Sequence, residues 1–389
     1  MEDGMSGFTF RTTPRVECAV GGLADVGRLF GELGCQTVLI VTDRGIVERG
    51  FAATAEESLR AAGIGVAVFD GVVADPPVAV VEEGVRAARE SGAEGVLGLG
   101  GGSSLDAAKV IALAANTDQP IEEMVGVERT RGARLKLILA PTTAGTGSEV
   151  TSVSVLTSGD NLKSAIFSPV LLPDIALLDA GLTVGMPRHV TAATALDAMV
   201  HAVEAYTSRT RKNPLADAMA VQALSLLGAN YRKVLAEPDN VDAREKMLLG
   251  SMLAGMAFIN ASVGAVHGLS YPLGARFHVP HGHGNALVMG PVFRFNLPAA
   301  EALYAELAPV LLPGRSFGTP RAAATALIDE LDAMFTESGL EGRISKLGVT
   351  EADLDPMAEE VVVSIGRLIA TNPRDMSRAE VRDLYAAIF

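Results

Sequence analysis

Cysteine and basic residues are scarce in this chain, and tryptophan is absent. Only Cys18 and Cys35 occur, so no disulfide framework is implied, and a reducing cytoplasm is the expected location. Lys and Arg number 32 against 46 for Asp and Glu, which gives a formal net charge of −14. Nucleic acids and anionic membranes would repel such a chain, so we expect neither as a partner.

Two further absences concern export and membranes. The first twenty residues contain Glu2, Asp3, Arg11 and Arg15 but no apolar segment, so they do not predict a secretory signal. No charged residue occurs between Met247 and Arg276, a stretch long enough to cross a bilayer. The stretch is rich in Gly, Ser and Asn, and it lacks an aromatic belt and a basic bias at its ends. We therefore expect a helix buried in a helical domain, not a membrane span.

Short apolar runs alternate with helix-like segments in the first half of the chain. We expect buried strands at 37–42, 66–69, 95–99 and 135–140, and a helix over 78–90. This alternation predicts a doubly wound α/β dinucleotide-binding domain over residues 1–184. Strand signals nearly vanish afterwards, and long Ala-, Leu- and Met-rich segments predict an all-α domain over residues 185–389. With 49% hydrophobic residues, 389 residues suffice for two packed domains.

A carboxylate and an imidazole, Asp197 and His201, are four residues apart in the second half. On a helix they would lie on one face, where they could share a metal ion. Their neighbours are apolar nearly all round, so the helix should be buried, and a buried carboxylate needs a partner. The alternative is an Asp–His hydrogen bond inside a core. His267 and His281 stand where apolar packing would not require imidazole, and the four together form a donor set for a borderline divalent metal.

These residues belong to longer motifs. Residues 191–206 read TAATALDAMVHAVEAY, residues 266–274 read VHGLSYPLG, and residues 280–282 read PHG. The motifs resemble those of the iron-containing (group III) alcohol dehydrogenase family, and the resemblance covers essentially the whole chain. It implies a dehydroquinate synthase-like fold, with an α/β domain followed by an all-α metal-binding domain. It also implies a ligand set of Asp197, His201, His267 and His281.

Two glycine-rich loops follow predicted strands in the α/β half. Residues 100–103 read GGGS and open a helix, so backbone N–H groups and the helix dipole would face an anion such as a pyrophosphate. The alternative is a tight turn. A second loop, PTTAGTGSE at residues 141–149, strengthens the interpretation. By resemblance to the family, the predicted cofactor contacts here are Gly101, Gly102, Ser103, Asp106, Thr142, Thr143, Thr146, Ser148, Lys163 and Leu182.

Asp43 ends the first predicted strand, with no helix partner evident nearby. An acid in this place would accept a hydrogen bond from the ribose 2′-OH of NAD and repel the 2′-phosphate of NADP. The alternative is a helix cap or a solvated turn. The acid precedes the glycine-rich loop, so the ordinary Rossmann fingerprint is absent and the interpretation depends on the resemblance.

The resemblance implies an NAD-dependent alcohol dehydrogenase or aldehyde reductase. The metal would act as a Lewis acid on the substrate oxygen, while the substrate carbon exchanges a hydride with C4 of the nicotinamide. Fe²⁺ is the ion that the family implies, and Zn²⁺ is the alternative because the same ligands bind it more strongly. We expect a small alcohol or aldehyde as the substrate and a homo-oligomer, in the simplest case a dimer.

The chain departs from the family near the expected reaction site. Tyr271 stands where the family often has a histidine thought to pass the proton, and Asp75 stands where an Asn often precedes Pro. His283, two residues after His281, is outside the common pattern. Tyr271 and His283 are therefore both candidates for proton transfer, and the alternative is that the proton leaves through water. The substrate pocket is expected to be walled by Tyr271 and by Val153, Phe258 and Ile259.

Three other readings stay open. A lyase of the dehydroquinate synthase type shares the fold but needs many basic residues for a phosphorylated acid, and few stand near the proposed ligands. Maleylacetate reductase-like enzymes share the fold but lack this ligand set. A catalytically silent assembly or metal-binding protein is disfavoured, because both the metal motif and the cofactor motif look intact.

Overall fold

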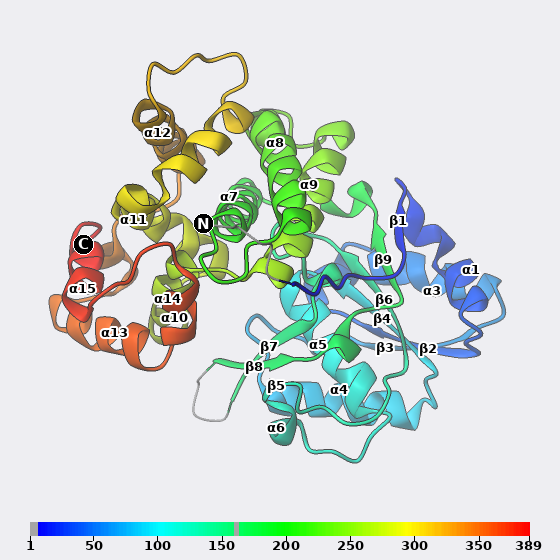
Figure 1. Ribbon diagram of the computed structural model, residues 1–389. Helices are drawn as coiled ribbons and strands as arrows, with labels where there is room; N and C mark the ends of the chain where they lie inside the picture. Colours follow the sequence, from blue (N-terminus) through cyan, green and yellow to red (C-terminus); the bar gives the residue numbers. More distant parts are fainter. Residues whose placement is uncertain (1–6, 159–162) are drawn as a thin grey trace. The chain divides into compact units, whose positions relative to one another are not determined.

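The structure is a computed structural model that describes residues 7–158 and 163–389. The described residues form two compact units (Figure 1). One unit spans Thr12–Met186 and Glu237–Met252, and the other comprises Pro187–Ala236, Leu253–Phe389 and the segment up to Arg11. We call them the α/β unit and the helical unit. The change of unit at Pro187 lies close to the predicted boundary, whereas the assignment of 237–252 to the α/β unit has no counterpart in the sequence pattern.

A six-stranded sheet forms the centre of the α/β unit. Its order is β1-β9-β6-β4-β2-β3, and all neighbouring strands pair in parallel. The strands are β1 (Val16–Cys18), β2 (Thr37–Val41), β3 (Gly65–Phe69), β4 (Gly95–Gly100), β6 (Lys136–Pro141) and β9 (Ile175–Leu178). Every residue of β4 is buried, which explains why its sequence is a continuous apolar run and not an alternating one. The doubly wound fold is thus confirmed.

Alternate residues of β2 enter two different cores. Leu39 and Val41 pack in the core that contains residues of α4 (Val78–Glu90) and α5 (Gly102–Ala114). Val38 and Ile40 pack in the core with α1 (Val26–Glu32) and α3 (Phe51–Ala61). Because successive side chains of a strand point to opposite faces, the sheet is covered on both sides.

A second, smaller sheet lies in the same unit and was not predicted. Its order is β5-β8-β7, with β5 (Gly126–Val127), β8 (Lys163–Phe167) and β7 (Val153–Thr157). Strands β7 and β8 pair antiparallel. The burial of β7 alternates along the strand, so one of its faces is packed and the other is partly open. Short helices α2 (Arg44–Glu48) and α6 (Ile121–Met124) complete the named α-helices of this part.

The described residues after Pro187 form helices and no strand. The helices are α7 (Arg188–Tyr206), α8 (Pro214–Ala236), α9 (Val241–Ala261), α10 (Ala265–Phe277), α11 (His281–Leu311), α12 (Pro320–Ser338), α13 (Glu351–Val363), α14 (Gly366–Thr371) and α15 (Arg378–Ala386). Fourteen of the nineteen residues of α7 are buried, as its apolar sequence predicts. The all-α second half is confirmed.

The uncharged stretch from Met247 to Arg276 is two helices, not the single one predicted. Helix α9 ends at Ala261, and α10 begins at Ala265 at an angle of 105°. Ser262, between them, has a positive φ of 79°, which interrupts the helix. No single described helix is long and apolar enough to cross a membrane. The bent pair α9 and α10 taken together has the length and apolar composition of a membrane span.

Candidate functional site

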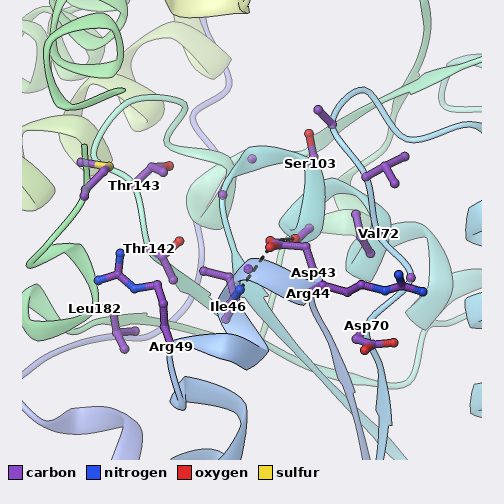
Figure 2. A pocket seen from close by; sticks show the side chains of 18 residues that line it. Asp43, Arg44, Ile46, Arg49, Asp70, Val72, Ser103, Thr142, Thr143 and Leu182 are labelled. Atoms are coloured by element: carbon purple, nitrogen blue, oxygen red, sulfur yellow. Dashed lines mark hydrogen bonds between the residues drawn. The ribbon is translucent and has the colours of Figure 1, made fainter. Parts of the chain in front are cut away.

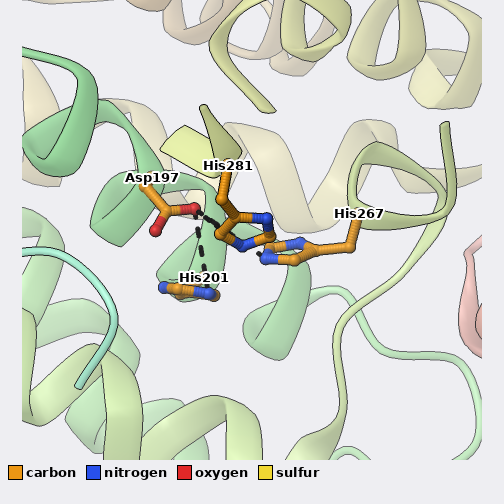
Figure 3. Close-up of side chains that lie close together, drawn as sticks. All are labelled: Asp197, His201, His267 and His281. Carbon is orange, nitrogen blue, oxygen red and sulfur yellow. Dashed lines mark ion pairs between the residues drawn. The ribbon is translucent and has the colours of Figure 1, made fainter. Parts of the chain in front are cut away.

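Four side chains of the helical unit converge on one point (Figure 3). Asp197 and His201 lie one turn apart on α7, His267 lies on α10, and His281 is the first residue of α11. Their candidate donor atoms all lie within 4.8 Å of one another. We call these four residues the donor set.

The distances within the donor set suit a single ion. Oδ1 of Asp197 lies 3.9 Å from Nε2 of His201, 3.9 Å from Nε2 of His267 and 3.6 Å from Nε2 of His281. Donors placed tetrahedrally at about 2.1 Å from a zinc-like ion would be about 3.4 Å apart. Small side-chain adjustments therefore bring all four donors to one ion. One carboxylate with three imidazoles suits Fe²⁺ or Zn²⁺ by donor chemistry.

Three side chains of the donor set are buried and the fourth is exposed. The side chains of Asp197, His201 and His267 are between 2% and 4% exposed, whereas that of His281 is 42% exposed. Substrate can therefore approach from the His281 side. Phe258, which is half-buried, stacks its ring on that of His201 with centroids 4.4 Å apart.

A glycine permits the close contact between α7 and the start of α11. A Cβ atom on Gly282 would lie 2.6 Å from the backbone oxygen of Ala193 and 3.4 Å from Cβ of Asp197. Any side chain at this position would therefore push His281 away from Asp197. Pro280 immediately precedes the helix, and its ring restricts φ at the point where the chain enters α11.

Asp197 is held in its anionic form. Burial by itself would raise the pKa of its carboxyl, but the positive charge that the three imidazoles carry when protonated and a hydrogen bond from Asn285 outweigh burial and lower that pKa. An anionic oxygen beside three imidazole nitrogens is the charge arrangement that a divalent cation requires.

Two buried polar residues that the sequence analysis did not single out contact the donor set. Nδ2 of Asn285 donates to Oδ1 of Asp197 at 2.6 Å and lies 3.1 Å from Nε2 of His267. Oε2 of Glu204 lies 2.6 Å from Nδ1 of His267. Each of these residues stands one helical turn beyond a member of the donor set, a spacing that was visible in the sequence.

A pocket of about 820 Å³ lies in the α/β unit, beyond the carboxyl ends of the central strands (Figure 2). In doubly wound sheets this edge is where nucleotides bind. Helix α5 begins there, so the N–H groups of its first turn and its dipole favour an anion. Seven of the predicted cofactor residues line the pocket: Asp43, Gly101, Gly102, Ser103, Thr142, Thr143 and Leu182.

Three other predicted cofactor residues, Asp106, Thr146 and Ser148, do not line this pocket. They form contacts between the two glycine-rich loops and α5. A Cβ atom on Gly102 would lie 2.8 Å from Cγ2 of Thr146, so only a glycine allows the loops to pack this closely. Asp106 accepts hydrogen bonds from Oγ of Ser148 at 2.6 Å and from the N–H of Val155 at 2.9 Å. Asp106, Thr146 and Ser148 therefore hold the pocket in shape.

Lys109 is a buried cation that the sequence analysis did not assign to this site. It is 0% exposed, and its Nζ donates to Oγ of Ser148 at 2.8 Å, Oγ1 of Thr151 at 3.0 Å and the carbonyl of Val153 at 2.8 Å. Burial lowers the pKa of this ammonium, although the charges of Asp106 and Glu149 oppose the shift. Lys109 fastens the second loop to α5.

Comparisons with known proteins agree with this geometry. Residues 13–180 match the family described as iron-containing alcohol dehydrogenase, and residues 191–389 match the C-terminal part of the same family. The chain belongs to the iron-containing alcohol dehydrogenase family. It is an NAD-dependent oxidoreductase that acts on CH–OH groups.

Individual relatives match over nearly the full length. Long-chain-alcohol dehydrogenase 1 of Geobacillus thermodenitrificans is 37% identical over 92% of this chain and 90% of its own length. The NAD-dependent methanol dehydrogenase of Bacillus methanolicus is 33% identical over 91% of this chain and 92% of its own. A crystal structure of 1,3-propanediol oxidoreductase superposes with a TM-score of 0.94 at 34% identity, covering 99% of this chain and all of the other.

Within this family framework, Asp43 has a partner that its sequence context did not reveal. It caps α2, where its Oδ1 accepts from the N–H of Ile46 at 3.2 Å, so the expectation that no helix lay nearby was wrong. Oδ2 lies 3.3 Å from Oγ of Ser104, and the residue also lines the pocket. Arg44 and Arg49 line the same pocket and were not anticipated.

Lys163, at the start of β8, forms an ion pair with Asp75. Asp75 has a positive φ of 52°, a conformation that aspartate tolerates better than most residues. Its N–H lies 3.3 Å from Oγ of Ser103 at the pocket. Asp75, which stands where the family often has an Asn, thus contacts both Lys163 and Ser103 at the edge of the pocket.

The two candidate proton-transfer residues differ in position. The ring of Tyr271 lies 6.2 Å from that of His281, measured between centroids, so it stands beside the donor set. His283 is buried, and its Nε2 donates to the carbonyl oxygen of Glu341 at 2.7 Å. This hydrogen bond occupies Nε2 and joins the start of α11 to the backbone at Glu341, and the proton-transfer role expected for His283 stays a prediction.

The residues expected to wall the substrate pocket belong to different units. Phe258 contacts the donor set through its stacking on His201, and the neighbouring Ile259 is half-buried on α9. Val153 begins β7 in the α/β unit, where its carbonyl accepts from Lys109.

Proposed function

We propose that this protein oxidises a primary alcohol of modest size, or reduces the matching aldehyde, at the donor set. The observation that carries the proposal is the convergence of Asp197, His201, His267 and His281 within 4.8 Å, with three side chains buried and that of His281 exposed. Fe²⁺ is the proposed ion, with Zn²⁺ as the alternative. Such an ion supplies Lewis acidity toward the substrate oxygen, and bound nicotinamide supplies the hydride acceptor.

The chain's own residues supply binding and orientation. Asp197 contributes the negative charge of the donor set, and the three imidazoles contribute neutral nitrogen donors. Phe258 covers the face of His201 and offers an apolar surface to the substrate carbon chain. In the α/β unit, the start of α5 would hold a pyrophosphate, and Asp43 would accept a hydrogen bond from the ribose 2′-OH. Tyr271 is the proposed proton-transfer residue nearest the donor set.

Assembly and location are part of the same proposal. We propose a cytoplasmic homodimer without a nucleic-acid or membrane partner. The family resemblance supports the dimer. The two unpaired cysteines suit a reducing compartment, and the net charge of −14 disfavours polyanionic partners.

A substrate panel tests the proposal. The panel should contain primary alcohols from one to about twelve carbons, diols, hydroxy acids and the corresponding aldehydes. This range is needed because the names of the relatives given above refer to alcohols of different carbon-chain length. Enzyme reconstituted with Fe²⁺ under anaerobic conditions should reduce NAD with at least one alcohol. The proposal fails if NADH binds but no alcohol or aldehyde in the panel is turned over.

His281→Ala is the matching site variant, because His281 is exposed and its loss leaves no buried cavity. We expect turnover to be abolished and bound metal to fall, while NADH still binds to the α/β unit. Stoichiometric metal in this variant and in His267→Ala would refute the ligand assignment.

A further inference from the structure

Glu204 is a buried carboxylate on α7 that the reaction described above does not use. It stands three residues after His201 and is 5% exposed. Oε1 accepts from the backbone N–H of Val266 at 2.7 Å, and Oε2 lies 2.6 Å from Nδ1 of His267. Gly264 leaves room for this contact, because a Cβ atom there would lie 3.1 Å from Oε1.

The contact determines which nitrogen of His267 carries its proton. A carboxylate oxygen accepts hydrogen bonds, so Nδ1 of His267 is the donor and carries the hydrogen. Neutral imidazole then leaves Nε2 with a free lone pair. Nε2 is the atom that faces Asp197, at 3.9 Å from its Oδ1.

The contacts of a second residue, Asn285, agree with the same tautomer. Oδ1 of Asp197 lies 2.6 Å from the side-chain amide of Asn285, and an anionic oxygen can only accept, so the NH₂ group must point there. The same NH₂ group lies 3.1 Å from Nε2 of His267 and 3.2 Å from Nε2 of His281. An Nε2 atom that accepts from this group carries no hydrogen, which agrees with the tautomer that the contact to Glu204 favours.

We propose that Glu204 is a positioning residue that holds His267 in the Nδ1–H tautomer and thereby keeps Nε2 available to a divalent ion. The proposal rests on the proposed ligand role of His267. Carboxylate–histidine–metal arrangements of this kind fix ring orientation and raise ligand basicity, and losing the outer residue typically lowers metal affinity by about 10–100-fold.

The test is Glu204→Gln. The N–H of Val266 still requires an acceptor, so the Gln carbonyl should take that place and turn its NH₂ group toward Nδ1 of His267. Nδ1 then becomes the acceptor and Nε2 the protonated nitrogen, which cannot bind a metal. The substitution therefore preserves the shape of the side chain and reverses the tautomer.

Two readouts are needed on the full-length protein. Metal-free protein is titrated with Zn²⁺ against a chromophoric chelator, and the imidazole nitrogens are followed by NMR in ¹⁵N-histidine-labelled protein. We expect the Zn²⁺ dissociation constant to rise by about 10–100-fold in Glu204→Gln and the His267 nitrogen signals to exchange their tautomer pattern. NADH affinity should remain that of the wild type.

Glu149→Gln is the matched control, because Glu149 is also a buried glutamate but lies in the α/β unit. It should leave the Zn²⁺ dissociation constant and the His267 tautomer unchanged. A Zn²⁺ dissociation constant for Glu204→Gln within about threefold of the wild-type value overturns the proposal.

The remaining outcomes are also decisive. The wild-type tautomer can be read without any variant, so an Nε2–H pattern for His267 in the metal-free wild-type protein overturns the proposal even if Glu204→Gln does not fold. If His281→Ala and His267→Ala both retain their metal, the ligand assignment itself is wrong. If His281→Ala loses metal while Glu204→Gln binds normally, only the role of Glu204 is refuted.

Discussion

Glu149→Gln should stabilise the protein relative to the wild type, and by more at pH 8 than at pH 5. Glu149 is 1% exposed, and its Oε1 has no hydrogen-bond partner among the described residues. Burial raises the pKa of this carboxyl from 4.5 to about 7, even though a backbone hydrogen bond and the charge of Lys109 act in the opposite direction. The folded protein therefore favours the protonated carboxyl.

The direction of the pH effect follows from the two pKa values. Because the folded-state pKa is the higher one, the stabilising contribution is fully present below pH 4.5 and is lost as the pH rises through about 7. The difference between the two values corresponds to about 3 kcal/mol, of which about 2.5 kcal/mol is lost between pH 5 and pH 8. Glutamine does not titrate, so it avoids this loss.

Thermal unfolding of the two proteins at both pH values checks the prediction. For a domain of this size, 1 kcal/mol corresponds to about 2–4 °C, so the gap in Tm should widen by about 5–10 °C between pH 5 and pH 8. Glu122→Gln, at an exposed position, should show no such widening. A gap for Glu149→Gln that is equal at both pH values would refute the reasoning.

Three further substitutions test other parts of the structure. Asp43→Gly should shift the ratio of kcat/KM values toward NADP by about tenfold or more, because it removes a negative charge from the pocket and leaves Arg44 to pair with the 2′-phosphate. The double variant with Arg44→Ala should lose this gain. An unchanged ratio for Asp43→Gly would contradict the proposed contact between Asp43 and the ribose 2′-OH. His283→Ala should lower Tm, because it removes the hydrogen bond to Glu341, but preserve kcat and its pH profile; loss of an acidic limb would instead indicate a proton-transfer role. Lys109→Met should weaken NADH binding without changing metal content, because it removes the hydrogen bonds that join the second glycine-rich loop to α5. Unaltered NADH affinity in a folded variant would show that these hydrogen bonds are not needed for NADH binding.

The elements that could be predicted from the sequence are those with strong periodicity and clear boundaries. Helix α4 spans Val78–Glu90, the predicted range, because two prolines precede it and Gly92 follows it. Strands β7 and β8 were not predicted. Their residues are half-buried and include Ser, Thr and Lys, so their composition resembles that of a loop.

For the candidate site, donor chemistry was visible in the sequence but side-chain orientation was not. Asp197 and the histidines stood out because their residue types are unusual in an apolar region. His283 is also an imidazole in this region, and its hydrogen bond to the backbone of Glu341 could not be read from the sequence. Glu204 escaped notice because a single glutamate in a helix is ordinary until its partner is known.

The exposure of His281 also governs how readily an ion exchanges with the solvent. An ion held by the donor set would be reached by a chelator from that side, and breaking the bond to His281 would open the path outward. His281 is the first residue of α11, where fraying of the helix end requires little local unfolding. Exchange should therefore be fast compared with unfolding of the helical unit, so the ion found after purification would reflect the buffers used as much as the affinity of the four ligands.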